Sequence, residues 1–191
     1  MNRGKKVPVV PGRSWAEIGR IGDHLIKKIY PELLRVPGPF PLDYFLEFEM
    51  RNAVGFGYDV QDLQLHIEAK TDPCSKTVIL STQTYEDLIH GIPRARFTVA
   101  HEIGHVILHA EYLQSLVSEH KGVLQLHRGE IPAFRDPECQ ANALASSLLM
   151  PTKHVVRLID EGIGVRQLTD LFNVSLEAAA YRVKNIQMFT K

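Results

Sequence analysis

The sequence has no excess of charge of either sign, because 22 Lys and Arg residues balance 22 Asp and Glu residues. Such a chain has no long-range attraction for nucleic acid or for an anionic membrane, so either partner would need a local patch. No apolar run approaches the roughly 20 residues that a membrane-spanning helix needs. The basic start MNRGKK leads into Val-Pro-Val-Val-Pro without the apolar stretch of a signal peptide. We expect a cytoplasmic protein with no membrane partner.

Cysteine is scarce as well. Cys74 and Cys139 are the two cysteines, and they form no CxxC pair, which excludes a disulfide framework and a thiolate zinc site. A length of 191 residues suffices for one compact domain with its own core, without disulfides. Histidine, in contrast, is plentiful: the chain has nine, and they cluster.

Hydrophobic periodicity predicts an α+β fold with a small β-sheet. Ser14 and Glu17 form a capping box that begins a helix, whose apolar stripe ends before Pro31. A second helix is expected over Leu42–Met50. Strands are expected in three short runs with alternation or β-branching: Ala53–Tyr58, Leu65–Ala69 and Thr77–Leu80.

The second half of the chain is predicted to be mostly helical. One helix begins near Pro93 and ends near Leu113, and Asp136-Pro137-Glu138 begins another that stops at Pro151. Residues 114–135 carry little periodicity, which indicates a loop over the site. Further helices are expected at Thr152–Glu161, Arg166–Phe172 and Leu176–Ile186.

The helix from Pro93 contains the pattern HExxH as His101, Glu102 and His105. Residues four apart lie on one helical face, so both imidazoles can converge on one ion. Glu102 is then placed to reach a water on the open side of the metal. Zinc lowers the pKa of such a water, and a carboxylate beside it can take its proton during attack on a carbonyl. The pattern predicts peptide hydrolysis at one zinc ion per chain, although two satisfied histidines beside a solvated glutamate would give the same letters.

A catalytic zinc ion normally takes a third protein ligand. The HExxHxxGxxH arrangement is excluded, because Leu108 and Glu111 stand where its Gly and third His would be. Glu138 is the better source, since it begins a helix with an apolar body that can pack on the first. The alternative is that Glu138 only complements the dipole of its own helix. Gly104, inside the first helix, is expected to permit close approach by a neighbouring element.

RFTVAHEIGHVILH followed by ExxANxxAxxLLMP resembles the ImmA/IrrE family of zinc metallopeptidases. The resemblance implies a zincin-like fold, with His101, His105 and Glu138 as zinc ligands and Glu102 as catalytic base. It also implies that Asn142 orients one of the two histidines, and that Gln140 stands where the family often has an acidic residue. The expected activity is that of a regulatory protease cleaving a specific protein, such as a helix-turn-helix repressor.

Other residues near the site have less specific patterns. His109 could support the site, but we expect it to stabilise the helix end. His120, His127 or Tyr112 could steady an oxyanion, and nothing selects among them. Tyr58 and Tyr85 could equally be packing residues. The strand from Thr77 to Ser81 is a candidate edge for binding an extended substrate.

The C-terminal stretch has the spacing of a helix-turn-helix, with Asn173 at the turn and Arg182 and Lys184 on the second helix. Its basic excess is small, so packing on the core is the expected role. A DNA-binding regulator with a structural or sensory metal remains the alternative function. The expected organisation is therefore a flexible lead over 1–13, a zinc metallopeptidase domain over 14–161, and a helix-turn-helix-like segment over 162–191 packed on the core.

Overall fold

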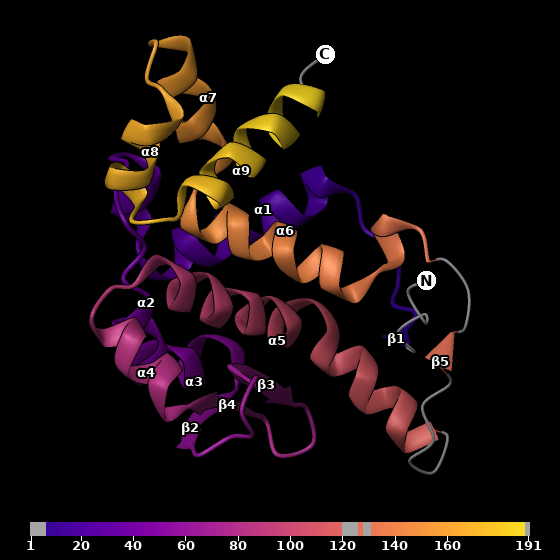
Figure 1. Ribbon diagram of the computed structural model, residues 1–191. Coiled ribbons are helices and arrows are strands. Elements are labelled where there is room, and N and C mark those ends of the chain that lie inside the picture. The colour runs from indigo at the N-terminus through magenta and orange to yellow at the C-terminus, as the bar shows by residue number, and fades with distance from the viewer. Residues whose placement is uncertain (1–6, 120–125, 128–130, 190–191) are drawn as a thin grey trace.

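The computed structural model describes residues 7–119, 126–127 and 131–189. The long helix α5 (Pro93–Glu119) crosses the middle of the molecule (Figure 1). Helices α1 (Trp15–Ile29) and α6 (Pro137–Leu149) lie on one side of it, and the sheet lies on the other. The fold is α+β, as the sequence predicted. Within these described ranges, none of the helices combines the length and the apolar character that a membrane span requires.

The sheet has three strands in the order β2-β4-β3, formed by β2 (Gly57–Gln61), β3 (Ala69–Asp72) and β4 (Thr77–Ser81). β4 pairs parallel with β2 and antiparallel with β3. The prediction for β4 is confirmed, whereas the other two strands begin later than expected, because the helix runs to Val54 and a turn holds Leu65. β4 is central, so Thr77–Ser81 is not the edge that we expected; β3 is the edge strand beside α5.

The remaining elements of the N-terminal half surround this sheet and α1. Ser14 caps α1 by accepting a hydrogen bond from the Glu17 backbone N–H. The predicted helix over Leu42–Met50 extends to Val54 and includes a π-helical turn. Besides α1 and the strands, the N-terminal half of the chain contains η1 (Pro31–Leu34), α2 (Leu42–Tyr44), η2 (Phe45–Glu49), α3 (Met50–Val54) and α4 (Thr82–Ile89). Of these, α4 was not predicted, because its polar residues carry little apolar periodicity.

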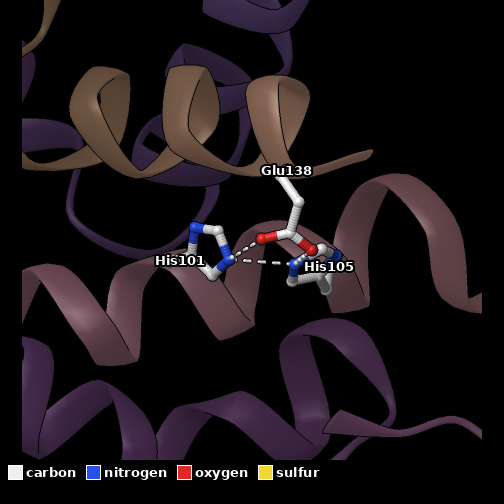
Figure 2. Close-up of side chains that lie close together, drawn as sticks. All are labelled: His101, His105 and Glu138. Carbon is white, nitrogen blue, oxygen red and sulfur yellow. Dashed lines mark hydrogen bonds and ion pairs between the residues drawn. The ribbon is translucent and has the colours of Figure 1, made fainter. Parts of the chain in front are cut away.

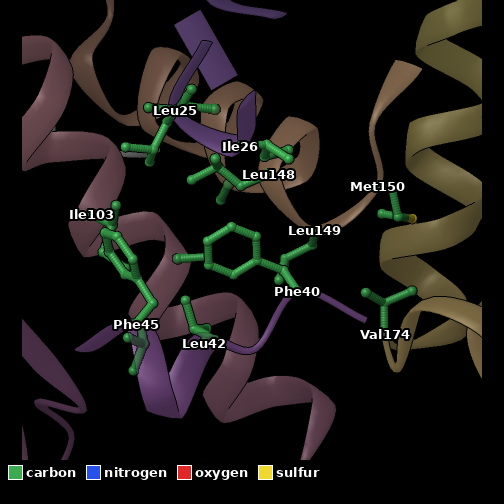
Figure 3. Packing of buried hydrophobic residues seen from close by; sticks show 14 of the residues in the cluster. Leu25, Ile26, Phe40, Leu42, Phe45, Ile103, Leu148, Leu149, Met150 and Val174 are labelled. Atoms are coloured by element: carbon green, nitrogen blue, oxygen red, sulfur yellow. The ribbon is translucent and has the colours of Figure 1, made fainter. Parts of the chain in front are cut away.

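The C-terminal helices were predicted closely. They are α7 (Thr152–Asp160), α8 (Val165–Phe172) and α9 (Leu176–Phe189), preceded by the short η3 (Ala133–Arg135). Phe172, Val174 and Ala179 belong to the same hydrophobic cluster as Ile103 of α5 and Leu148 of α6. Figure 3 shows Phe40 and Leu149 in this cluster, with Val174 packed towards it from the C-terminal helices.

The N-terminal segment packs on the body of the protein from Val7 onward, whereas the sequence led us to expect a flexible lead over 1–13. β1 (Val7–Pro8) pairs antiparallel with β5 (Leu126–His127). The backbone N–H groups of Val10 and Arg13 donate to the carbonyls of Arg135 and Phe134, and Val10 is buried. The segment therefore lies directly beside η3 and the start of α6.

Candidate metal centre

The candidate centre lies where α5 and α6 run side by side. α5 continues to Glu119, six residues beyond its predicted end, so His101 and His105 sit well inside it. α6 begins as predicted: Asp136 caps it by accepting hydrogen bonds from the backbone N–H groups of Glu138 and Cys139. The cap fixes the first turn of α6, from which Glu138 projects towards α5 (Figure 2).

His101, His105 and Glu138 converge as the sequence predicted. The two Nε2 atoms lie 2.9 Å apart. One Glu138 oxygen lies 3.5 Å from His101 Nε2 and the other 3.6 Å from His105 Nε2. One potential ligand atom from each residue lies within 4.8 Å of the others. Two imidazoles and a carboxylate thus meet at one point, from two different helices.

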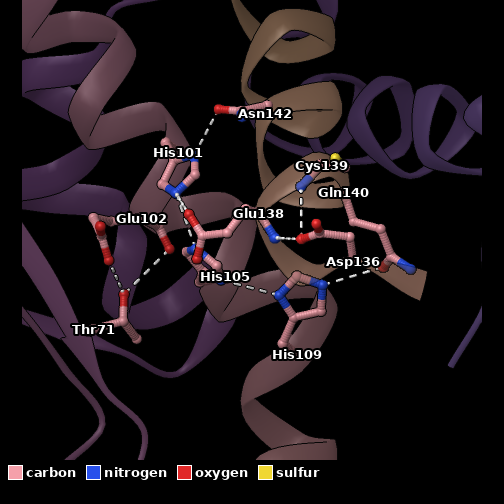
Figure 4. Close-up of polar contacts among 10 residues, drawn as sticks. All are labelled: Thr71, His101, Glu102, His105, His109, Asp136, Glu138, Cys139, Gln140 and Asn142. Atoms are coloured by element: carbon pink, nitrogen blue, oxygen red, sulfur yellow. Dashed lines mark hydrogen bonds and ion pairs between the residues drawn. The ribbon is translucent and has the colours of Figure 1, made fainter. Parts of the chain in front are cut away.

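A hydrogen bond orients the His101 ring. Its Nδ1 lies 2.8 Å from Asn142 Oδ1. An amide oxygen only accepts, so this contact places the proton on Nδ1 and leaves the Nε2 lone pair facing the convergence point. The role that the family resemblance implied for Asn142 therefore falls on His101, as Figure 4 shows.

Glu102 is nearly buried, at 9% exposure, beside the two histidines. Thr71, on the edge strand β3, donates a 2.6 Å hydrogen bond to its Oε2 (Figure 4). No sequence pattern pointed to Thr71, because its role depends on the packing of β3 against α5. The contact joins the edge of the sheet to the carboxylate that we expected to act as base.

Burial shapes the electrostatics of the cluster. It lowers the pKa of His105 to about 4, with a smaller electrostatic contribution from the neighbouring His101 and His109, so His105 is held neutral. Burial also lowers the pKa of His101, but hydrogen bonds with Glu138 and Asn142 outweigh this and leave its pKa raised. Burial raises the pKa of Glu102, partly offset by the hydrogen bond from Thr71 and by His101.

The cluster opens into a cleft between α5, the start of α6 and the edge of the sheet. Ala69, Lys70, Thr71 and Pro73 line the sheet side. Ala110 and Leu113, on the later turns of α5, line another part of the wall. Because α5 runs to Glu119, the first part of the region 114–135, which we expected to form a loop over the site, is helical.

The structure also decides between the alternatives left open for other residues near the site. His109 does not stabilise a helix end, because α5 continues past it; it is buried and contacts His105. Tyr85 donates a hydrogen bond to Glu47 and stacks on Tyr58, so both tyrosines are packing residues away from the cluster. Tyr112 does not line the cleft.

The other two oxyanion candidates have no described side chain. His120 lies outside the described residues, and for His127 only the backbone is described.

The donor set fits a zinc ion. Catalytic zinc takes imidazole nitrogens and carboxylate oxygens and leaves one position for water. The two Nε2 atoms lie 2.9 Å apart beside a carboxylate. Lone pairs that face each other at this distance repel, and a cation between them would remove the repulsion. The same three residues are the only such group of His, Cys, Asp and Glu found within the described ranges.

Comparisons with known proteins relate the second half of the chain to a family. Residues 90–184 match the family Peptidase_M78, described as the IrrE N-terminal-like domain, and the chain resembles the ImmA/IrrE family as its motifs predicted. Among the curated proteins, no match was found. A solved structure of a Mycobacterium tuberculosis transcriptional regulator aligns with 88% of this chain at 17% identity and a TM-score of 0.54. That likeness concerns the fold alone, and the alignment covers 50% of the regulator's chain.

Proposed function

We propose that this chain is a zinc-dependent endopeptidase, because residues 90–184 match the family Peptidase_M78, described as the IrrE N-terminal-like domain. His101, His105 and Glu138 hold one zinc ion per chain. The observation that carries the proposal is their convergence from two helices, beside a buried glutamate and an open cleft. When bound, zinc would polarise a substrate carbonyl and lower the pKa of a water.

Glu102 acts as the general base in this proposal. It follows His101 in the sequence and lines the same cleft as the three ligands. Its carboxylate is held by Thr71, so its position is set before substrate arrives. A positioned base of this kind contributes about 10²- to 10⁴-fold to a rate. The residue therefore serves the reaction without serving as a ligand.

An extended polypeptide is the substrate class that the cleft suits best. β3 is an edge strand, and Ala69, Lys70 and Thr71 line the cleft beside the cluster. A substrate strand can pair with such an edge through main-chain hydrogen bonds and lie across the site. We propose a regulatory protease whose target is a specific protein, such as a helix-turn-helix repressor. The solved structure named a transcriptional regulator is in keeping with a regulatory setting.

The DNA-binding alternative draws less support. It relied on Arg182 and Lys184 of α9 as the basic side chains of a recognition helix. Arg182 instead donates to Met150 O and Thr152 Oγ1, so its guanidinium is engaged inside the protein. The C-terminal helices are better placed to stabilise α6 than to contact phosphates.

The Glu102→Gln variant tests the protease proposal. Zinc per chain is measured on the purified protein, and cleavage is followed with candidate repressors encoded beside its gene, with and without chelator. The variant should keep one zinc ion and lose cleavage by about 10²-fold or more. Glu111→Gln, at an exposed glutamate of the same helix, is the matched control and should cleave normally. A fully active Glu102→Gln protein would refute the proposed role.

A further inference from the structure

His109 and Gln140 are buried polar residues for which the proposed reaction has no use. They are 1% and 0% exposed. Burying a polar side chain destabilises the folded state unless the side chain is hydrogen-bonded. The hydrogen-bond partners of His109 and Gln140 should therefore show what the two residues do. Those contacts form one continuous chain that ends at His105.

The orientation of Gln140 is fixed by two backbone carbonyls. Its Nε2 lies 2.9 Å from Pro11 O and 2.7 Å from Phe134 O, and both carbonyls can only accept. The amide NH2 group must therefore face them. Its Oε1 is left to face His109 Nε2, at 3.1 Å. A carboxylate here could not donate to either carbonyl.

This orientation determines where the protons of the two histidines lie. Because Gln140 Oε1 accepts, His109 Nε2 carries a proton, and Nδ1 is the ring nitrogen left to accept a hydrogen bond. His109 Nδ1 lies 3.1 Å from His105 Nδ1, which therefore carries the donated proton. His105 Nε2 is left with its lone pair at the convergence point, and Figure 4 shows the contacts that run from Gln140 through His109 to His105.

We propose that His109 and Gln140 are positioning residues that hold His105 in the ring orientation and tautomer needed to bind the metal. The inference rests on the proposed function, since it deepens the account of the same site. It also makes the N-terminal segment part of the site's support, because Pro11 supplies one of the two carbonyls that orient Gln140. Partners of this kind typically change metal affinity by about 10- to 100-fold when removed.

Zinc affinity gives the first test, measured on full-length protein by competition with a chromophoric chelator. His109→Leu and Gln140→Met should each weaken zinc binding about 10- to 100-fold. Because the two residues act in series, the double variant should bind little more weakly than His109→Leu alone. His154→Leu is the matched control: His154 is also buried, but it bonds to Leu33 O away from the site. It should leave zinc affinity unchanged.

The tautomers give a second test that does not depend on a variant folding correctly. Nitrogen-15 NMR of histidine-labelled wild-type protein should show His109 protonated at Nε2 and His105 protonated at Nδ1. His109 protonated at Nδ1, or unchanged zinc affinity in both folded variants, would overturn the positioning role. Wild-type protein that binds no zinc would contradict the proposed function itself. The tautomers of His105 and His109 would still show whether Gln140 and His109 orient the His105 ring.

Discussion

Gly104 of α5 lies against the backbone of Ala141 in α6. A Cβ atom at Gly104 would come 2.8 Å from the Ala141 carbonyl oxygen and 3.0 Å from its Cα. Backbone atoms of a packed helix cannot move aside as a flexible side chain would. The close approach predicted from the sequence is therefore real, and it brings the start of α6 near enough for Glu138 to reach the two histidines.

Replacing Gly104 by alanine should thus impair the site. Alanine is favoured over glycine by about 1 kcal/mol in a helix interior, so propensity alone predicts stabilisation. The clash should dominate and cost about 1–3 kcal/mol, as overpacking does. Chemical denaturation of the metal-free protein and chelator competition would show lower stability and weaker zinc binding. A stabilised variant with wild-type zinc affinity would mean that the helices need no such contact.

Thr71 should affect the reaction without affecting the metal. Thr71→Val keeps the shape but removes the hydroxyl that donates to Glu102. A hydrogen bond to a charged group contributes about 1.5–3 kcal/mol, so kcat should fall about 10- to 100-fold. Thr71→Ser retains a hydroxyl and should recover most of the rate. Equal kcat values for the valine and wild-type proteins would remove Thr71 from the account.

Glu68 should give the protein a defined acid sensitivity. Arg94 and Thr98 of α5 each donate a hydrogen bond to one of the two carboxylate oxygens of Glu68. These bonds hold the residue that precedes β3 against α5. Burial raises the pKa of Glu68, but these hydrogen bonds outweigh it and leave its pKa below the ordinary 4.5.

Because the folded-state pKa is depressed, the stabilisation is present above pH 4.5 and is lost as pH falls through the folded pKa. The free energy of unfolding should therefore fall more steeply on acidification in wild type than in Glu68→Gln. Parallel curves for the two proteins would contradict the assignment.

Arg182 should matter for stability rather than for DNA. Burial lowers the pKa of Arg182 to about 10, although Asp23 acts in the opposite direction. Arg182→Ala removes the partner of Met150 O and Thr152 Oγ1 and should cost about 1–3 kcal/mol for each polar group left unsatisfied. Lys184→Ala, at an exposed position of the same helix, should change stability little. A Lys184→Ala variant that unfolds as easily as Arg182→Ala would argue against this difference.

Much of the architecture could be predicted because local signals were strong. Ser14 and Asp136 begin helices where their side chains cap backbone N–H groups, and Pro151 marks the end of α6. The convergence of His101 and His105 followed from helical geometry, and that of Glu138 from its place at a helix start.

What escaped prediction depends on contacts between distant segments. Thr71 reaches Glu102 through the packing of β3 on α5, and Gln140 reaches Pro11 across most of the chain. His109 was misjudged because the helix was expected to end near it, and a helix end would have exposed its ring. The edge strand was misassigned because strand order is a property of the whole sheet.

The central claim is that one metal ion is held by three named side chains. Diffraction from crystals of zinc-loaded protein, measured on both sides of the zinc absorption edge, tests it most directly. The account predicts one anomalous peak per chain, bonded to His101 Nε2, His105 Nε2 and a Glu138 carboxylate oxygen. A fully zinc-loaded crystal with no peak at these atoms, or with zinc bound only elsewhere, would contradict it.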